Sequence, residues 1–164
     1  MADFLSNHDG NCQTVSAQSF KVCDDQQHPM SYLDLTGSAR GAEVKNDASR
    51  ELIFRPVDRA LYGSTGGRRC DLMLRTTGND RLCFVELKDW KVSGWLADGV
   101  EQLENTLQDF EDSHPGVLMA APCRSAYVVN IARHGFSRVH SAVMRDFVRK
   151  HHVILRTTQP VVIR

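Results

Sequence analysis

The 164-residue sequence lacks any long apolar run. No stretch approaches the roughly 20 apolar residues of a membrane-spanning helix, and the N-terminus lacks the basic start and apolar stretch of a signal peptide. Five cysteines at irregular spacing, an odd number without an export signal, argue against a disulfide framework. We therefore expect a cytoplasmic protein without a membrane partner.

Two ligand-binding motifs are incomplete. The glycine-rich segment 63–67 is not followed by Gly-Lys-Ser/Thr, which argues against a nucleotide-binding P-loop. Two histidines and two cysteines near the N-terminus are of the types that bind zinc, but the tight C-x-x-C knuckle is missing. These four residues are His8, Cys12, Cys23 and His28. Scattered polar residues and buried thiols are the simpler interpretation, and the sequence leaves metal binding by the four open.

The hydrophobic content of 41% and charged content of 24% are ordinary for a globular protein. The length suits one domain with its own core and is short for two. Residues 1–30 are polar with little periodicity, so we expect an irregular or weakly ordered extension there, with a short strand around Ser19–Cys23. Residues 31–164 are expected to form a single domain.

Charge is balanced overall but unevenly placed. Residues 124–164 contain eight Lys and Arg and one acid, whereas residues 1–123 contain 12 basic and 19 acidic residues. Such asymmetry is typical of a nucleic-acid contact in the C-terminal third, although a basic helix that pairs with the acidic part would produce it equally well. Arg138 and Arg145, on a helix expected there, are the candidates for phosphate contacts.

The most informative stretch is residues 69–90. Cys70–Arg75 and Leu82–Lys88 are rich in apolar and β-compatible residues, and the turn sequence Thr-Gly-Asn-Asp at 77–80 separates them. This pattern predicts a β-hairpin. It carries one acid, Asp71, on its first strand and an acid-x-lysine triplet at 86–88 on its second.

The register of this hairpin decides which side chains meet. A four-residue loop pairs Thr76 with Arg81 and so places Asp71 opposite Glu86, whereas a shift by two residues places Asp71 opposite Lys88. Either register keeps the three polar groups on one face, because side chains alternate along a strand. A slip by one residue would move Asp71 to the other face.

Two carboxylates held side by side in a partly buried site repel each other unless a proton or a cation lies between them. The Leu87 side chain points to the opposite face and leaves its carbonyl near the edge of the site. Oxygen ligands with retained waters favour Mg²⁺ or Mn²⁺. Asp71, Glu86 and Lys88 therefore point to divalent-metal and phosphodiester chemistry.

A helix is expected over residues 36–53, where apolar residues recur at steps of four. Glu43, Asp47 and Glu51 follow one another at the same spacing and form an acidic stripe beside the apolar face. A solvated surface is the usual meaning of such a stripe. In a functional interpretation Glu51 is the favoured acid to reach the metal site, ahead of Glu43.

A second helix is predicted over Trp95–Glu111, where apolar residues recur at spacings of three and four. Asp98, Gln102 and Thr106 lie on a flank of its apolar face. The Gln102 amide is suited to hydrogen-bond a phosphate or a metal-bound water, although glutamines on helices are more often surface residues. The remaining expected elements are a buried strand, a helix and a final edge strand, over residues 126–132, 136–151 and 153–156, with Val161–Ile163 as a further edge segment.

Asp71 and Glu86-Leu87-Lys88, with 14 residues between the acids, resemble the signature of the PD-(D/E)xK nuclease superfamily. The resemblance covers roughly residues 38–132, and Cys70 stands where the family usually has proline. It implies an α/β fold of the restriction-endonuclease-like type, with a central mixed sheet flanked by helices.

The resemblance also implies roles. Asp71, Glu86 and the Leu87 carbonyl would bind Mg²⁺ or Mn²⁺, and Lys88 would orient or deprotonate the attacking water. An acid from the preceding helix, Glu51 or Glu43, would assist. The expected function is a Mg-dependent phosphodiesterase, a deoxyribonuclease of repair or of defence against foreign DNA, with DNA as partner and a homodimer or helper protein as possible assemblies. The alternative is a nuclease-like scaffold that no longer cleaves and binds nucleic acid or a protein partner.

Overall fold

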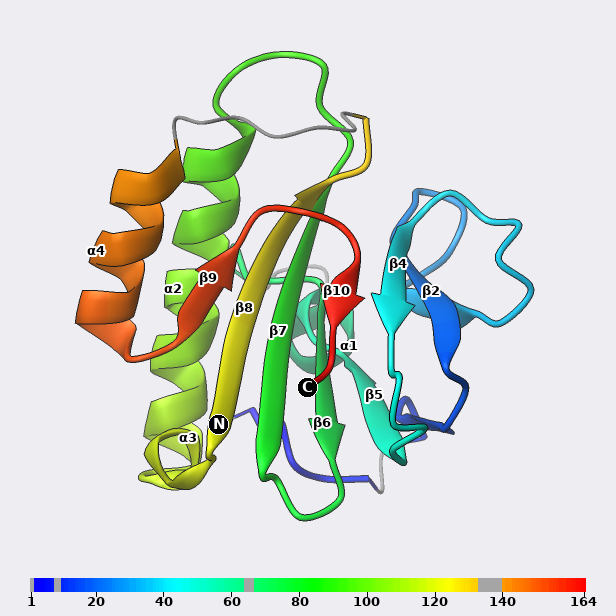
Figure 1. Cartoon of the computed structure of the whole chain (residues 1–164), viewed down its shortest axis with the longest axis horizontal. Helices are drawn as coiled ribbons and strands as arrows, with labels where there is room; N and C mark the ends of the chain where they lie inside the picture. The colour runs from blue at the N-terminus through cyan, green and yellow to red at the C-terminus, as the bar shows by residue number, and fades with distance from the viewer. Residues whose placement is uncertain (1, 8–9, 64–66, 133–139) are drawn as a thin grey trace.

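The computed structural model describes residues 2–7, 10–63, 67–132 and 140–164. A six-stranded mixed sheet forms the centre of this part of the chain (Figure 1). The first four strands pair antiparallel, and the last two continue parallel to the fourth. In sheet order the strands are β1 (Gln13–Val15), β5 (Leu52–Pro56), β6 (Leu72–Thr76), β7 (Arg81–Lys88), β8 (Cys123–Asn130) and β9 (Ile154–Arg156). The expected α/β class with a mixed central sheet is confirmed.

The two faces of this sheet are covered differently. Helices α2 and α4 lie on one side of it, and a four-stranded sheet lies on the other (Figure 1). The expectation of a central sheet flanked by helices therefore holds for one face of the sheet. The second sheet, in order, contains β10 (Val161–Val162), β4 (Ala42–Lys45), β2 (Ser19–Cys23) and β3 (Tyr32–Asp34). The helices are α1 (Asp58–Tyr62), α2 (Trp95–Ser113), α3 (Val117–Ala120) and α4 (Ser141–His151).

Burial on both faces explains the nearly continuous apolar sequence of the central strands. Met73 and Phe84 face the helices, whereas Leu72, Leu74 and Val85 face the second sheet. All five are at most 1% exposed. Alternate residues thus contribute to two cores that the central sheet separates.

Helix α2 confirms the prediction of a helix beginning at Trp95, and it extends two residues beyond the predicted end. Its buried face centres on Phe110, whose ring lies edge-on to Phe84 at 5.4 Å and to Phe4 at 5.3 Å between centroids. Among the described residues, no helix combines the length and apolar character that crossing a membrane requires.

The helix expected over residues 36–53 is wrong. Strand β4 and the start of β5 occupy this segment, with a turn between them that the Asn46 side chain holds through hydrogen bonds with Arg50. Burial alternates over Ala42–Lys45, as in a half-buried strand. Pairing with β2 and β6 outweighed a weak helical pattern, because a helix there would leave one edge of β2 and one edge of β6 unpaired.

Most described residues of the segment 1–30 lie outside helices and strands, as expected, but the segment contributes two strands. The expected short strand is present as β2, at Ser19–Cys23, and it lies between β3 and β4. Strand β1 adds a further edge to the central sheet, and Phe4 is fully buried against α2. Of the final segments, β9 extends the central sheet as expected, whereas β10 joins the second sheet beside β4.

Candidate active site

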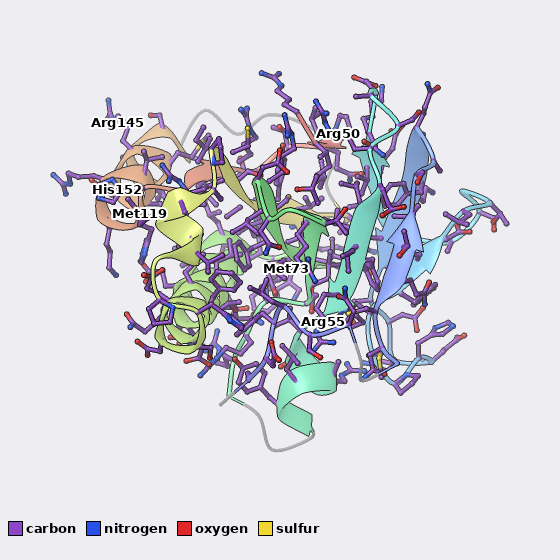
Figure 2. The ribbon with its side chains drawn as sticks, turned by 90° about the horizontal axis from the view of Figure 1, so that it is seen from below. Arg50, Arg55, Met73, Met119, Arg145 and His152 are labelled. Carbon is purple, nitrogen blue, oxygen red and sulfur yellow. The ribbon has the colours of Figure 1, made fainter. Side chains whose placement is uncertain are left out.

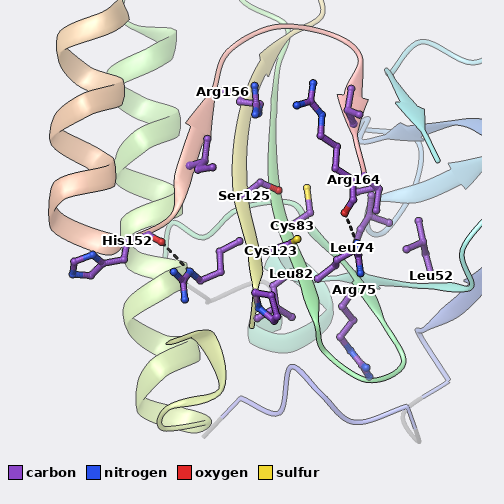
Figure 3. Close-up of a pocket in the computed structure, with 16 residues that line it drawn as sticks. Leu52, Leu74, Arg75, Leu82, Cys83, Cys123, Ser125, His152, Arg156 and Arg164 are labelled. Carbon is purple, nitrogen blue, oxygen red and sulfur yellow. Dashed lines mark hydrogen bonds between the residues drawn. The ribbon is translucent and has the colours of Figure 1, made fainter. Parts of the chain in front are cut away.

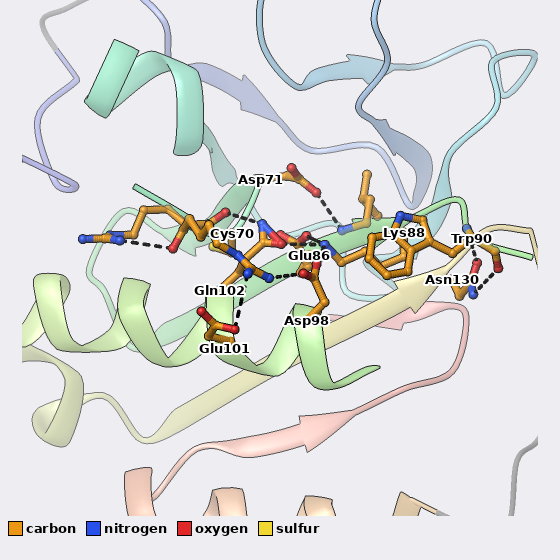
Figure 4. Close-up of polar contacts among 12 residues, drawn as sticks. Cys70, Asp71, Glu86, Lys88, Trp90, Asp98, Glu101, Gln102 and Asn130 are labelled. Atoms are coloured by element: carbon orange, nitrogen blue, oxygen red, sulfur yellow. Dashed lines mark hydrogen bonds and ion pairs between the residues drawn. The ribbon is translucent and has the colours of Figure 1, made fainter. Parts of the chain in front are cut away.

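The β6–β7 hairpin has the predicted register. Leu72 pairs with Val85, and continuing the ladder by one residue places Asp71 opposite Glu86. The turn at 77–80 is tight, with Asn79 in the left-handed region at φ 57° and its N–H bonded to the Thr76 carbonyl. Asp71, Glu86 and Lys88 therefore come together where β6 begins and β7 ends (Figure 4).

Glu86 and Lys88 are buried side by side, at 1% and 7% exposure. The Lys88 Nζ lies 2.5 Å from Glu86 Oε1 and 2.5 Å from Asp98 Oδ2. It also donates to Gln102 Oε1 at 2.5 Å (Figure 4). A single ammonium thus serves two carboxylates and one amide, which leaves a net negative charge around it.

Helix α2 supplies half of this arrangement because it packs very closely on the sheet. A Cβ added at Gly99 would lie only 2.4 Å from Val128 Cγ1 on β8 and 3.3 Å from Glu86 Cγ. The close approach brings Asp98 and Gln102 to Lys88. Gln102 Nε2 also donates to the Arg69 carbonyl at 3.0 Å, which ties the helix to the segment just before β6.

Asp71 is half-buried, and its carboxylate accepts a hydrogen bond from the Leu87 N–H at 2.7 Å. In a strand the N–H and C=O of one residue point toward the same neighbour, so the Leu87 carbonyl points to the side where Asp71 lies. The Asp71 carbonyl accepts from Ser31 Oγ at 2.9 Å and from the Val57 N–H at 2.8 Å. These contacts fix the backbone at the start of β6.

The carboxylates of the site repel one another. Burial raises the pKa of Glu86 well above its ordinary value, and Asp71 adds to the effect while Lys88 opposes it. Burial, followed by repulsion from Asp24, raises the pKa of Asp71 to about 8. For Lys88, burial favours a lower pKa, but the charges of Glu86 and Asp98 outweigh it and raise the pKa. Asp71 and Glu86 therefore hold their protons more tightly than ordinary carboxyl groups when no metal ion is bound.

Two further acids border the site, and no sequence pattern predicts either of them. Asp24 follows β2, and Asp58 opens α1. Burial raises the pKa of each, and Arg59 and Lys88 oppose the effect; the charge of Asp24 also raises the pKa of Asp58. They reach Asp71 only because the second sheet and α1 pack beside the hairpin, and such non-local packing has no periodic signature.

Asp98 is a further candidate site residue that lies outside the sequence motif. It pairs with Lys88 and with Arg68. A signal did exist, because Asp98 and Gln102 stand four residues apart on the flank of a predicted helix and thus share one face. What the sequence alone did not provide is the direction in which that flank points.

A divalent cation fits the donor set formed by Asp71, Glu86 and the Leu87 carbonyl. Glu86 Oε2 is buried and has no hydrogen-bond partner among the described atoms, and a lone anionic oxygen of this kind suits a metal. All three donors are oxygens, as Mg²⁺ and Mn²⁺ prefer, and waters complete the shell of such ions. Within the described residues, no three His, Cys, Asp or Glu side chains converge on one metal position.

Two sequence candidates lie away from the carboxylates. Glu51 is exposed just before β5, at the end paired with Thr76, whereas Asp71 lies beyond the opposite end of that ladder. Arg145 is exposed on α4, which packs on β9, three strands from β6; it lies at the edge of the molecule in Figure 2. Arg138 lies outside the described residues. Neither Glu51 nor Arg145 is brought to the carboxylates.

The four possible zinc ligands are not gathered either, as far as the structure describes them. His8 lies outside the described residues. Cys12 contacts the Ser6 carbonyl and Arg55, and His28 pairs with Asp25. Cys23 is buried within β2.

Trp90 lies at the mouth of the site. Its ring centroid is 5.4 Å from Lys88 Nζ, and its side chain is partly exposed. Asn130 holds its backbone by accepting from the Trp90 N–H and donating to the Trp90 carbonyl. An aromatic surface is therefore fixed beside the ammonium.

No protein-family model, curated protein or solved structure matches this chain. Its own geometry therefore carries the functional argument. The site combines a buried carboxylate pair, an ammonium held by three acceptors and an exposed aromatic ring. Such a set can bind a divalent cation and, through that cation and Lys88, an anionic substrate.

Proposed function

We propose that this protein is a metal-dependent nuclease of the restriction-endonuclease-like PD-(D/E)xK class that hydrolyses phosphodiester bonds of DNA. The observation that carries the proposal is the buried Glu86 carboxylate, which has one oxygen on Lys88 and the other without a hydrogen-bond partner. An unsatisfied buried polar atom costs about 1–3 kcal/mol, and more when charged. A cation bound between Glu86 and Asp71 would remove that cost.

The order of elements supports the class in part. The acid immediately precedes β6, β7 carries the E-x-K triplet, and α2 and β8 follow as the helix and strand of the resemblance. The helix expected before them is absent, since β4 and β5 occupy its place. Glu51 is therefore not proposed as the assisting acid; Asp24 and Asp58, which border Asp71, are better situated.

Each residue then has a role. Asp71, Glu86 and the Leu87 carbonyl would hold Mg²⁺ or Mn²⁺, and the bound metal supplies Lewis-acid stabilisation of charge on the reacting phosphate. Lys88 adds a positive charge and a hydrogen-bond donor for the phosphate or for the attacking water. Gln102 and Asp98 keep the ammonium in place.

Two features support nucleic acid as the substrate. The partly exposed Trp90 ring beside Lys88 is suited to stack on a base. The basic residues of α4, including Arg145, lie exposed on the outer helix, where long DNA can reach them. We propose DNA as the substrate, and repair or defence against foreign DNA as the biological setting.

The second candidate is a nuclease-like scaffold that binds nucleic acid or a protein partner without cleaving it. The contacts of Lys88 favour this alternative: three acceptors at 2.5 Å engage its ammonium fully. A site closed in this way would have to release Lys88 from Glu86 before it could act on a phosphate.

Supercoiled plasmid and single-stranded DNA, incubated with Mn²⁺, with Mg²⁺ or with chelator, distinguish the two. We expect cleavage only with metal, and its loss in Glu86→Gln, Asp71→Asn and Lys88→Ala. The matched control is Asp112→Asn, which removes one exposed acid from α2 and should cleave normally. Cleavage that persists in Glu86→Gln or in chelator would contradict the proposal. Metal-independent DNA binding without cleavage would support the scaffold.

A further inference from the structure

A cavity of about 280 Å³ lies at the opposite end of the central sheet from Asp71 and Glu86 (Figure 3). Its walls come from the end of β6, the start of β7, the start of β8, strand β9 and the segment after β10. Along β7, Arg81 in this wall stands five residues before Glu86, about 17 Å at the rise of a strand. The cavity is therefore separate from the candidate active site.

The lining of the cavity combines cationic and apolar groups. Five arginines contribute, and no Asp or Glu does so within the part of the chain that the structure describes: Arg75, Arg81, Arg124, Arg156 and Arg164. The apolar part of the wall comes from Leu and Val/Ile side chains of the central sheet and the C-terminal segment, including Leu74 and Ile163. A ligand bound here would meet positive charge on one part of its surface and hydrocarbon on another.

Most of this positive charge has no carboxylate beside it. Of the five arginines, Arg81 alone forms an ion pair with an acid, Asp80, among the described residues. Arg124 donates to the carbonyls of Met119 and His152, which are neutral acceptors.

Arg75 is likewise held by neutral acceptors. Its guanidinium donates to the Leu5 carbonyl and to the side chains of Asn7 and Asn79, all neutral. Burial lowers the pKa of Arg75; Cys12 and Asp3 oppose the effect, and repulsion from Arg55 adds to it. An anion in the cavity would offset charge that the chain itself leaves uncompensated.

We infer that this cavity binds a small phosphate monoester of the nucleoside monophosphate class. Guanidinium groups match phosphate oxygens with paired hydrogen bonds, and a phosphate monoester carries a charge of about −1.5 to −2 at neutral pH. The volume lies just below the range of about 300–1,000 Å³ that is usual for small-molecule sites. It is the size of one mononucleotide and is too small for a second one.

Arg156 and Arg164 are the arginines best suited to the phosphate. Both are labelled toward the same end of the cavity in Figure 3. No ion pair or side-chain hydrogen bond ties either guanidinium to another described residue, so replacing them removes charge without breaking the fold. The inference does not depend on the nuclease proposal.

The test is calorimetric titration of the whole chain with deoxyadenosine 5′-monophosphate in chelator, which leaves no metal for the other site. We expect one molecule bound per chain and no comparable binding of deoxyadenosine. Arg156→Gln and Arg164→Gln should each weaken binding by about tenfold or more, the worth of a hydrogen bond to a charged group. Arg149→Gln, which changes an arginine 83% exposed on α4, is the matched control and should bind normally.

Four outcomes would overturn the inference. These are no binding at millimolar nucleotide, equal binding of the nucleoside, unchanged affinity in Arg156→Gln, or displacement by a short oligonucleotide without a terminal phosphate. The last would mean that the cavity recognises phosphodiesters of a nucleic-acid backbone. Glu86→Gln should bind the nucleotide normally, so failure of the nuclease proposal would leave this result unchanged.

Discussion

Asp71→Asn should change how the stability of the metal-free protein depends on pH. Burial and repulsion from Asp24 raise the pKa of Asp71 from 3.8 to about 8. A carboxyl with a higher pKa in the folded state holds its proton more tightly when folded. Stability of the wild type therefore falls as pH rises from about 4 to about 8 and levels off above that range. The amide in Asp71→Asn cannot ionise, so its stability should fall less.

The size of the effect follows from that pKa. The difference between 3.8 and about 8 sets an upper limit of about 6 kcal/mol on the free energy of unfolding lost across the range. Asp71 is only half-buried, and solvent screening reduces this figure to about 2 kcal/mol. For a chain of this length, about 2 kcal/mol corresponds to a change of about 4–8 °C in Tm.

Thermal and urea unfolding in chelator, between about pH 5 and about pH 8, measure this difference. Mn²⁺ added at the upper end should restore the stability of the wild type, because a ligand that binds only the folded state stabilises it, and should do little for Asp71→Asn. Asp112→Asn controls for the loss of one negative charge. Parallel pH curves for wild type and Asp71→Asn, or an equal response of both to Mn²⁺, would refute the reasoning.

Two further variants test how α2 serves the site. Asp98→Asn should slow cleavage by about ten- to a hundredfold, the usual cost of losing a supporting partner, with metal binding measured by calorimetry largely kept, since Asp98 contacts Lys88 and not the proposed metal ligands. Gly99→Ala gains about 1 kcal/mol of helix propensity. Overpacking against Val128 costs about 1–3 kcal/mol, so urea unfolding should show a net loss of stability, accompanied by weaker cleavage as α2 moves away from Glu86. A more stable Gly99→Ala protein, or full activity in Asp98→Asn, would contradict these expectations.

The sequence predicts the hairpin and α2 well because each is fixed by local signals. The turn at 77–80 sets the register through its length, and the alternation of apolar residues leaves no other face for Asp71 and Glu86. In α2 the spacing of three and four is sustained over four turns, up to Phe110. In both, the local preference and the tertiary packing agree.

Prediction fails where non-local pairing decides the structure. In residues 36–53 an apolar spacing of four is also compatible with a strand, a turn and a second strand, and only pairing with β2 and β6 selects these. Asp24 and Asp58 come to the site from the second sheet and from α1, which the sequence does not place beside the hairpin. The misassigned helix also explains the choice of Glu51, since that acid was selected by its helical spacing.

The fold shows where the basic residues of the C-terminal third lie. Three of the cavity arginines, Arg124, Arg156 and Arg164, belong to the basic C-terminal third that the sequence linked to nucleic acid through its helix. Strand β7 runs from the cationic cavity to the candidate active site. Arg81 is its first residue and lines the cavity, whereas Glu86, near its end, lies among carboxylates. The basic third therefore contributes to a pocket as well as to an exposed helix. The proposed ligand sites at the two ends of β7 can therefore be tested separately, by substituting the arginines at the cavity or Glu86 at the other end.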